Sequence, residues 1–235
     1  MKFIVYSLIF ILTSFSAFSQ RSLKDSLFSE VIYTNIKSYS YQANQAYATK
    51  NFAKGKELFR NFIQEKVANK YLDNFKAKNL NGALVSINSY FKKPVILITY
   101  ASWCVVEEGE IPALNELAKR YHDKIDFVVL FWDNANKARK QAKQFNNKVT
   151  ILYIDERENM FASEVKNLKH ALGFPLAYYI DSEDRIIDIK KKTPELLRPK
   201  ESYIDAYVQN YNEFVDGLNS LLINGEAINE YLVGK

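Results

Sequence analysis

Cysteine and histidine are scarce in this chain. Its 235 residues include one cysteine, Cys104, and two histidines, His122 and His170. A single cysteine excludes a disulfide within the chain, because that bond joins two cysteine sulfurs. The three residues also lack the spacing typical of a zinc site. We therefore expect no metal and no other cofactor.

Glycine and proline are also few, with seven and five copies, and no low-complexity tract is present. No glycine-rich phosphate loop, zinc-protease helix or serine nucleophile turn is found. Hydrophobic residues make up 48% and charged residues 25%, which is typical of a globular chain with one sizeable core. The net charge of +5 is a mild bias, and basic residues alternate with acidic ones, so we expect no nucleic-acid partner.

The first nineteen residues resemble a secretory signal peptide. Lys2 precedes an apolar run from Phe3 to Leu12, and Ala17 and Ser19 place small side chains before a cleavage point ahead of Gln20. The apolar run is shorter than the roughly 20 residues that a membrane span needs. We predict a periplasmic protein with no other membrane contact. The alternative is that the segment stays in place as an anchor.

Hydrophobic spacing predicts an α/β protein. Aromatic and aliphatic residues recur at helical spacing in residues 29–70, and Asn81-Gly82 forms a turn signal for a hairpin. The segment from Val95 to Tyr100 is apolar without alternation, as in a central strand that is covered on both faces. Helix and strand patterns then alternate, which favours a sheet flanked by helices. The predicted helices are 105–121, 135–145 and 159–172, and the predicted strands are 125–132, 149–154, 176–180 and 186–189.

A long amphipathic segment follows these strands, and its apolar residues predict a C-terminal helix with one buried face. They are Tyr203, Ile204, Tyr207, Val208, Tyr211, Phe214, Val215, Leu218 and Leu222. We divide the chain into a signal peptide (1–19), an N-terminal helical extension (20–69), a main domain (70–195) and a C-terminal helical extension (196–235).

Residues 101–112, Ala-Ser-Trp-Cys-Val-Val-Glu-Glu-Gly-Glu-Ile-Pro, carry the most specific signal. This segment resembles the active-site turn of thioredoxin-like proteins, especially the exported TlpA and redoxin group, in which Trp-Cys-x-x-Cys opens a helix and Glu-Ile-Pro often follows. The loop Gly173-Phe174-Pro175 is similar to the cis-proline loop of that family. The resemblance covers roughly residues 70–192. It implies a thioredoxin-like fold with a central mixed sheet, and a nucleophile at Cys104.

The chain departs from the family pattern where the second cysteine would stand, because Glu107 occupies that position and Val105-Val106 replace the usual Gly-Pro. A two-cysteine centre uses one thiolate to attack a partner disulfide and the other to release the partner. This chain could carry out only the first of these two steps, the attack on the partner disulfide. Peroxide reduction is disfavoured, since Leu97 and Ala101 stand where peroxiredoxins carry Pro and Thr or Ser. Copper delivery would also need a second cysteine.

The reactivity of Cys104 can be argued in two directions. A place at a helix N-terminus would stabilise a thiolate. Against this, Glu107 and Glu108 disfavour a second anion nearby, and a thiol pKa near the free-cysteine value of about 8.5 would favour a site that binds rather than reacts. Trp103 could also be an ordinary core aromatic, and Pro175 an ordinary proline at a strand start.

Two functions remain open at this stage. The first is a monothiol or degenerate thiol:disulfide oxidoreductase, in which Cys104 is the nucleophile, Glu107 exchanges its proton and an outside thiol resolves the mixed disulfide. The second is a non-catalytic protein-binding module. Either would contact its partner through Trp103, Val105, Val106, Phe174 and Pro175. The expected partner is an exported protein or a small thiol, and a dimer linked through Cys104 is a further possibility.

Overall fold

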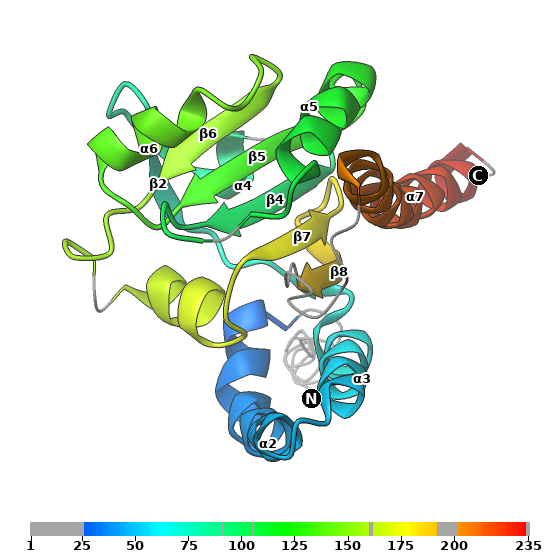
Figure 1. Cartoon of the computed structure of the whole chain (residues 1–235). Coiled ribbons are helices and arrows are strands. Elements are labelled where there is room, and N and C mark those ends of the chain that lie inside the picture. The colour runs from blue at the N-terminus through cyan, green and yellow to red at the C-terminus, as the bar shows by residue number, and fades with distance from the viewer. Residues whose placement is uncertain (1–25, 91, 105, 160–161, 192–201, 234–235) are drawn as a thin grey trace, which may run out of the picture.

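The computed structural model describes residues 26–90, 92–104, 106–159, 162–191 and 202–233. The predicted signal peptide and Val105 lie outside these ranges. One eight-stranded mixed sheet has the order β1-β8-β7-β4-β5-β6-β2-β3, with helices on both faces (Figure 1). The strands are β1 (Lys70–Tyr71), β2 (Lys76–Asn79), β3 (Leu84–Ser86), β4 (Val95–Tyr100), β5 (Asp126–Phe131), β6 (Val149–Tyr153), β7 (Leu176–Ile180) and β8 (Arg185–Lys191).

The helices cover the chain from its N-terminal extension to its C-terminal segment. They are α2 (Phe28–Ala48), α3 (Phe52–Phe62), α4 (Ile87–Tyr90), α5 (Glu110–Tyr121), α6 (Ala135–Ala142) and α7 (Tyr203–Val233), with two π-helical turns, η2 (Ile63–Val67) and η3 (Val165–His170). Strands β4, β5 and β6 are parallel, whereas β7 is antiparallel to β4 and β8 is antiparallel to β7. This arrangement confirms the predicted thioredoxin-like fold with helical additions at both ends.

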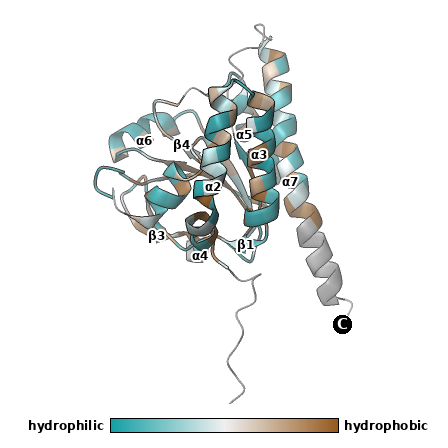
Figure 2. Ribbon diagram, turned by 90° about the horizontal axis from the view of Figure 1, so that it is seen from below, coloured by the Kyte–Doolittle hydropathy of each residue, from teal (hydrophilic) through white to brown (hydrophobic). Residues whose placement is uncertain are grey.

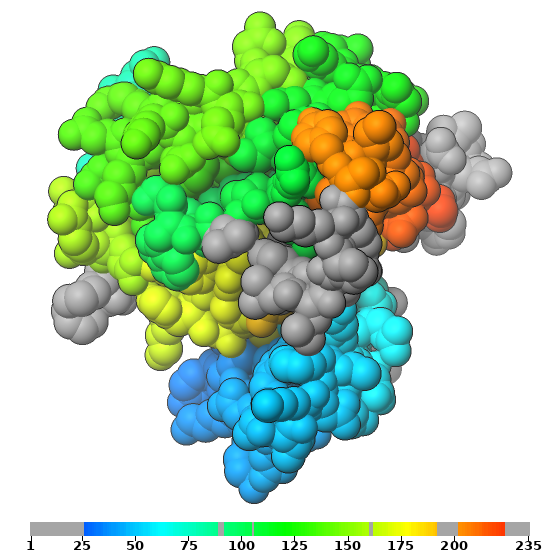
Figure 3. Space-filling view, viewed as in Figure 1, coloured from blue at the N-terminus to red at the C-terminus, as the bar shows by residue number. Residues whose placement is uncertain are grey.

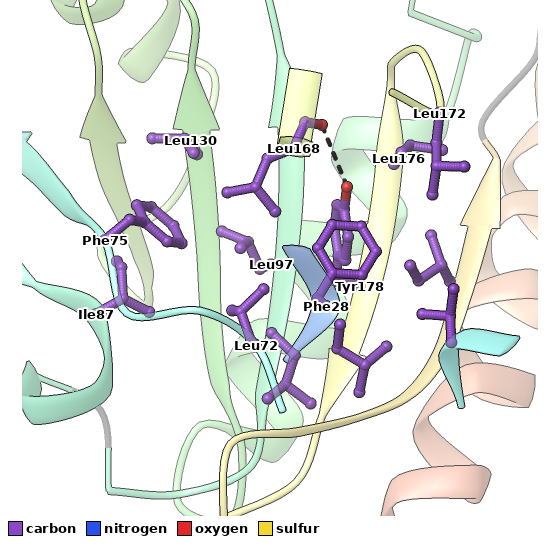
Figure 4. Close-up of a cluster of buried hydrophobic side chains, with 14 of the residues drawn as sticks. Phe28, Leu72, Phe75, Ile87, Leu97, Leu130, Leu168, Leu172, Leu176 and Tyr178 are labelled. Carbon is purple, nitrogen blue, oxygen red and sulfur yellow. Dashed lines mark hydrogen bonds between the residues drawn. The ribbon is translucent and has the colours of Figure 1, made fainter. Parts of the chain in front are cut away.

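Alternating residues of the central strands divide the core into two layers, as pleating requires. In β4, Leu97 faces a cluster that includes residues of α2, α3 and η3, whereas Ile96 and Ile98 face α5 and α7. Figure 4 shows the first cluster, where the Tyr178 hydroxyl donates to the Leu168 carbonyl at 3.2 Å. The unbroken apolar character of β4 therefore reflects helices on both faces.

The N-terminal helices share the core of the main domain. Phe28 of α2 is buried against Tyr178 of β7, with ring centroids 6.1 Å apart and ring planes at 90°. Phe62 of α3 belongs to the same buried cluster as Leu97. These helices pack on the domain, as predicted, and Figure 2 shows α3 between α2 and α7. The three boundaries between the four predicted segments stay predictions.

Three predicted helices differ from the observed ones. The helix predicted over 159–172 is present but shorter, with α-helical residues 163–164 followed by the π-helix η3, in which the Leu168 carbonyl accepts from Tyr178. In α7, Tyr203, Ile204 and Val208 of the predicted apolar face are exposed, whereas Phe214 and Leu218 are buried. The helix predicted to start at Val105 starts at Glu110, with consequences for the site.

No helix among the described residues combines the length and apolar character that crossing a membrane needs.

Candidate functional site

Cys104 lies in the loop that joins β4 to α5. The backbone folds back on itself there, since the Cys104 N–H donates to the Ala101 carbonyl at 2.9 Å and the Ala101 N–H donates to the Cys104 Sγ at 3.3 Å. The side chain is half-buried and packs at the junction of the two core layers. The fold thus holds the sulfur at the end of the central strand, which is where the family resemblance predicts it.

The expected place of Cys104 at a helix N-terminus is wrong. Gly109 is the N-cap of α5 and has a left-handed backbone with φ 85° and ψ −13°, which favours glycine. A Cβ on Gly109 would lie 2.7 Å from backbone atoms of Tyr207, so α7 presses directly on this turn. The loop therefore stays non-helical up to Gly109. Because the helix dipole acts mainly within the first turn, Cys104 receives little stabilisation from it.

The surroundings of the sulfur favour the neutral thiol. Burial raises the pKa of the Cys104 thiol, and the carboxylates of Asp133 and Glu110 act in the same direction. The Ala101 N–H and the Lys169 ammonium lower the pKa but do not reverse the shift. Cys104 is therefore mainly protonated at neutral pH, and the thiolate that attacks disulfides is scarce.

The sequence analysis did not identify Glu110 as a charged residue of the site. It is only 3% exposed, at the first position of α5, and its carboxylate pairs with the hydroxyl of the buried Tyr100. Burial, followed by the charge of Glu110, raises the pKa of the Tyr100 phenol. The signal was present, because Glu110 stands four residues before Leu114 and seven before Leu117, on the buried face of the helix.

Asp133 was also missed. It follows β5 and accepts from the Ser102 backbone N–H at 2.6 Å and from the Ser102 hydroxyl at 2.8 Å. Lys137 approaches the same carboxylate at 3.7 Å. Asp133 therefore anchors the start of the Cys104 loop and places a negative charge near the thiol. Because β5 neighbours β4 only in space, the sequence offered no local sign of this contact.

Glu107, which the family resemblance predicts to stand in place of a second cysteine, contacts α7. The Asn210 amide donates to the Glu107 carboxylate at 3.3 Å, and Asn210 is buried. The contact ties the loop to the C-terminal helix. The predicted role of Glu107 in proton exchange with Cys104 stays a prediction.

Trp103, Phe174 and Pro175 meet beside the Cys104 loop. The Phe174–Pro175 peptide bond is cis, which confirms the expectation from the resemblance. Pairing of Thr99 with Leu176 across β4 and β7 brings the two loops together. The rings of Trp103 and Phe174 lie 5.1 Å apart at 68°, and Trp103 is 68% exposed. Trp103 is therefore a surface aromatic rather than part of the core.

Lys169 lies beneath this surface. Its side chain is buried, pairs with Glu156, and holds its Nζ 5.3 Å from the centre of the Phe174 ring. The exposed Trp103 ring, the Phe174 ring and the Lys169 side chain beneath them lie beside the cis-proline, and we call these residues the tryptophan patch (Trp103, Lys169, Phe174 and Pro175).

A pocket of about 210 Å³ opens on the other side of the Cys104 loop. Cys104, Val106, Phe145 and two glutamines of the α6 region, Gln141 and Gln144, contribute to its lining. Gln141 donates to the Ser102 carbonyl at 3.4 Å. Val106 thus lines this pocket, whereas it was predicted to contact a partner together with Trp103 and Phe174. Within the described ranges, no three His, Cys, Asp or Glu side chains are grouped to hold a metal ion.

Comparison with known proteins places this geometry in a family. The sequence model described as the AhpC/TSA family matches residues 68–189, which is more than half of the 235 residues. The match runs from the end of η2 to β8 and includes both loops of the site. It agrees with the resemblance to thioredoxin-like redoxin proteins.

Curated relatives have names that point the same way. The chain is 27% identical over 117 residues to thioredoxin-like protein YneN of Bacillus subtilis, covering 49% of this chain and 66% of that protein. It is 27% identical over 116 residues to thiol-disulfide oxidoreductase ResA of Bacillus thuringiensis subsp. konkukian, covering 48% and 64%. The chain thus spans about two thirds of the length of these relatives.

Among solved structures, the chain is similar to the thioredoxin domain of a thiol-disulfide oxidoreductase from Bacteroides vulgatus. The identity is 17%, the TM-score is 0.44, and the match covers 61% of this chain and 94% of that one. A thioredoxin-like protein from Bacteroides caccae matches with a TM-score of 0.45 at 15% identity, covering 60% of this chain and 52% of the other. The fold assignment rests on the strand order rather than on these scores.

Proposed function

Because the chain belongs to the AhpC/TSA family, we propose that it is a thioredoxin-fold protein that binds an extended protein segment without completing thiol–disulfide exchange. The observation that carries the proposal is the lone sulfur. Cys104 is the only cysteine in the sequence, and Glu107 occupies the place of the resolving cysteine. A chain with this site cannot release a disulfide-linked partner by its own second thiol.

The features around Cys104 support binding over exchange. The thiol pKa is raised by burial, and α5 starts six residues after the sulfur, so the helix dipole gives the nucleophile little activation. The tryptophan patch, by contrast, keeps the features of a contact surface. An exposed tryptophan supplies a large apolar area together with an N–H donor, which is why this residue is frequent at interfaces.

The partner is an extended segment of an exported protein. Backbone groups of such a segment would lie along the cis-proline loop, while an apolar side chain would cover Trp103 and Phe174. Export through a signal peptide in residues 1–19 and a periplasmic location are part of the same proposal. They rest on Lys2 and the apolar run that follows it.

Binding of an unfolded chain tests the proposal. The probe is reduced and carboxymethylated α-lactalbumin, which has no free thiol and no disulfide. The full chain and its Cys104→Ala variant should bind it equally, and Trp103→Ala should lose at least roughly tenfold in affinity, as removal of an interface hot spot does. Tyr33→Ala is the matched control, because Tyr33 is also an exposed aromatic, on α2. No binding, or binding unaffected by Trp103→Ala, would overturn the proposal.

Monothiol exchange is the second candidate, and one observation favours it: the Cys104 sulfur is half-buried rather than sealed in the core. In that reaction the Cys104 thiolate attacks one sulfur of a partner disulfide, a Cys104–partner disulfide forms, and the other partner sulfur leaves as a thiolate that takes up a proton. An added thiol then reverses the link. Mixing the folded chain with 5,5′-dithiobis(2-nitrobenzoate) measures this first step. A rate above that of free cysteine at pH 7 would favour exchange over binding alone.

A further inference from the structure

A second cavity lies away from the sulfur, between the N-terminal helices and the main domain. It has a volume of about 580 Å³ and is lined by residues of α3, β8 and α7, together with Tyr47, Gln64, Glu107 and Glu110. Pockets for small ligands commonly measure 300–1,000 Å³, so this space fits a molecule of that class. Figure 3 shows the N-terminal helices as a lobe below the domain, with α7 on the side of the same face. We call this space the side cavity.

Aromatic rings form one wall of the side cavity. Tyr47 and Phe52 have ring centroids 6.3 Å apart across the turn between α2 and α3, and both line the space together with Phe59. The Tyr47 ring packs directly on Gly55, where an added Cβ would lie 2.6 Å from the ring. Tyr47 and Phe52 are partly open to solvent. This wall can therefore cover the apolar body of a ligand.

Two cations at the same wall have no carboxylate partner among the described residues. Arg60 follows Phe59 on α3 and is exposed. The Lys191 Nζ lies 6.0 Å from the Phe59 ring centre, and desolvation by the surrounding protein lowers its pKa although its side chain still reaches solvent. No described acidic group lies within ion-pair distance of either one. An incoming carboxylate would supply the missing counter-charge.

The acidic groups that line the side cavity have hydrogen-bond partners within the protein. Glu107 accepts from Asn210, Glu110 pairs with Tyr100, and Glu213 accepts from Gln209 at 3.3 Å. Asp188 accepts from Gln64 at 3.4 Å, and burial raises its carboxyl pKa. The α3 wall thus has unpaired positive charge, while the acids of the other walls have hydrogen-bond partners within the protein.

We propose that the side cavity binds a small carboxylate with an apolar body, such as a medium-chain fatty acid. The carboxylate contacts Arg60 and Lys191, and the apolar body covers Tyr47, Phe52 and Phe59. This site is separate from the tryptophan patch and from the Cys104 sulfur. It lies between the N-terminal extension, the main domain and α7, and most of its lining residues are outside the segment 68–189 that the family model matches.

Three ten-carbon ligands test the assignment by calorimetric titration of the full chain: decanoate, decanol and decylamine. They share one apolar body and differ in head-group charge. We expect decanoate to bind at least roughly tenfold more tightly than the other two, because a hydrogen bond to a charged group is typically strong enough to change Kd by that factor. Equal affinities, tighter binding of decylamine, or no binding of decanoate would overturn the proposal.

Variants on one helix then locate the site. Arg60→Gln should weaken decanoate binding about tenfold, whereas Lys54→Gln should leave it unchanged, because Lys54 lies on the same helix, pairs with Glu57 at 3.1 Å and does not line the cavity. Gly55→Ala should also weaken binding, by displacing the Tyr47 ring. Unfolding curves of each variant confirm that the fold is intact. Equal losses of decanoate affinity in Arg60→Gln and Lys54→Gln would contradict the proposed site. Neither outcome affects the interpretation of the α-lactalbumin assay, which tests the proposed function.

Discussion

Replacing Gly109 with alanine should destabilise the protein through the contact between the Cys104 loop and α7. Gly109 has φ 85°, and a Cβ there would lie 2.7 Å from the backbone of Tyr207. Gly82 offers a matched control, since it has φ 87° in the β2–β3 turn and a Cβ there would meet nothing within 4 Å. Both substitutions introduce the same backbone strain. Only Gly109→Ala also forces a helix backbone to move.

The expected loss of unfolding free energy is the sum of two contributions, the backbone strain and the overpacking against α7. A left-handed backbone costs a residue with a Cβ roughly 1–2 kcal/mol, which is the whole expected loss for Gly82→Ala. Overpacking a well-filled contact adds typically about 1–3 kcal/mol. Gly109→Ala should therefore lower the free energy of unfolding by roughly 2–5 kcal/mol. The difference between the two variants isolates the loop–α7 contact.

Urea denaturation of the two variants and the unsubstituted chain measures this difference. The circular dichroism signal reports unfolding, and similar m values would show that the variants expose similar surface. Loosening of α7 should also expose the thiol, so iodoacetamide should modify Cys104 faster in Gly109→Ala than in Gly82→Ala. Equal stability losses in the two variants would refute the reasoning, because α7 would then not constrain the loop.

Three further predictions concern the groups around the sulfur. Asp133→Ala should cost roughly 1–3 kcal/mol of unfolding free energy, because the Ser102 N–H loses its acceptor; a loss near zero in urea denaturation would contradict this. Tyr100→Phe should cost roughly 1.5–3 kcal/mol by removing the hydroxyl that pairs with the buried Glu110, measured in the same way, and an unchanged midpoint would count against that pair. The thiol pKa is higher in the folded chain than in the unfolded chain, so the stability that the neutral Cys104 thiol contributes should be complete below about pH 8.5 and should be lost as the pH rises through the folded-state pKa. The Cys104→Ser variant should lack this loss of stability at high pH. Identical profiles of stability against pH for the two proteins would disprove the prediction.

Much of the fold was predictable because its signals are local. The apolar run Val95–Tyr100 gave the central strand with its correct bounds, and Asn81-Gly82 marked the β2–β3 turn. The start of α5 was predicted too early, although Gly109 and Pro112 are local signs of it. Proline is tolerated in the first turn of a helix but not in its interior, so Pro112 fits a start at Glu110. The contact of Gly109 with α7 could not be read from the sequence.

In the candidate site too, some residues could be predicted from local motifs, whereas others depend on contacts in space. Motif spacing identified Cys104, Trp103 and Pro175, and pairing of β4 with β7 brings their loops together. Burial raises the pKa of the thiol most, and two of the charges that act on it come from elements distant in the sequence, namely Asp133 after β5 and Lys169 in η3. Their effect depends on distances in space rather than on spacing in the sequence. The sequence therefore located the sulfur but left its reactivity open.

The pKa of the Cys104 thiol tests the central claim most directly. It is obtained from the rate of alkylation by iodoacetamide between pH 5 and pH 11, with the folded chain compared with the same chain in urea. The single cysteine makes the signal unambiguous. A folded-state pKa above that of the unfolded chain, and above the free-cysteine value of about 8.5, is the predicted result. A folded-state pKa below about 7 would show an activated nucleophile and would contradict the account of a binding protein.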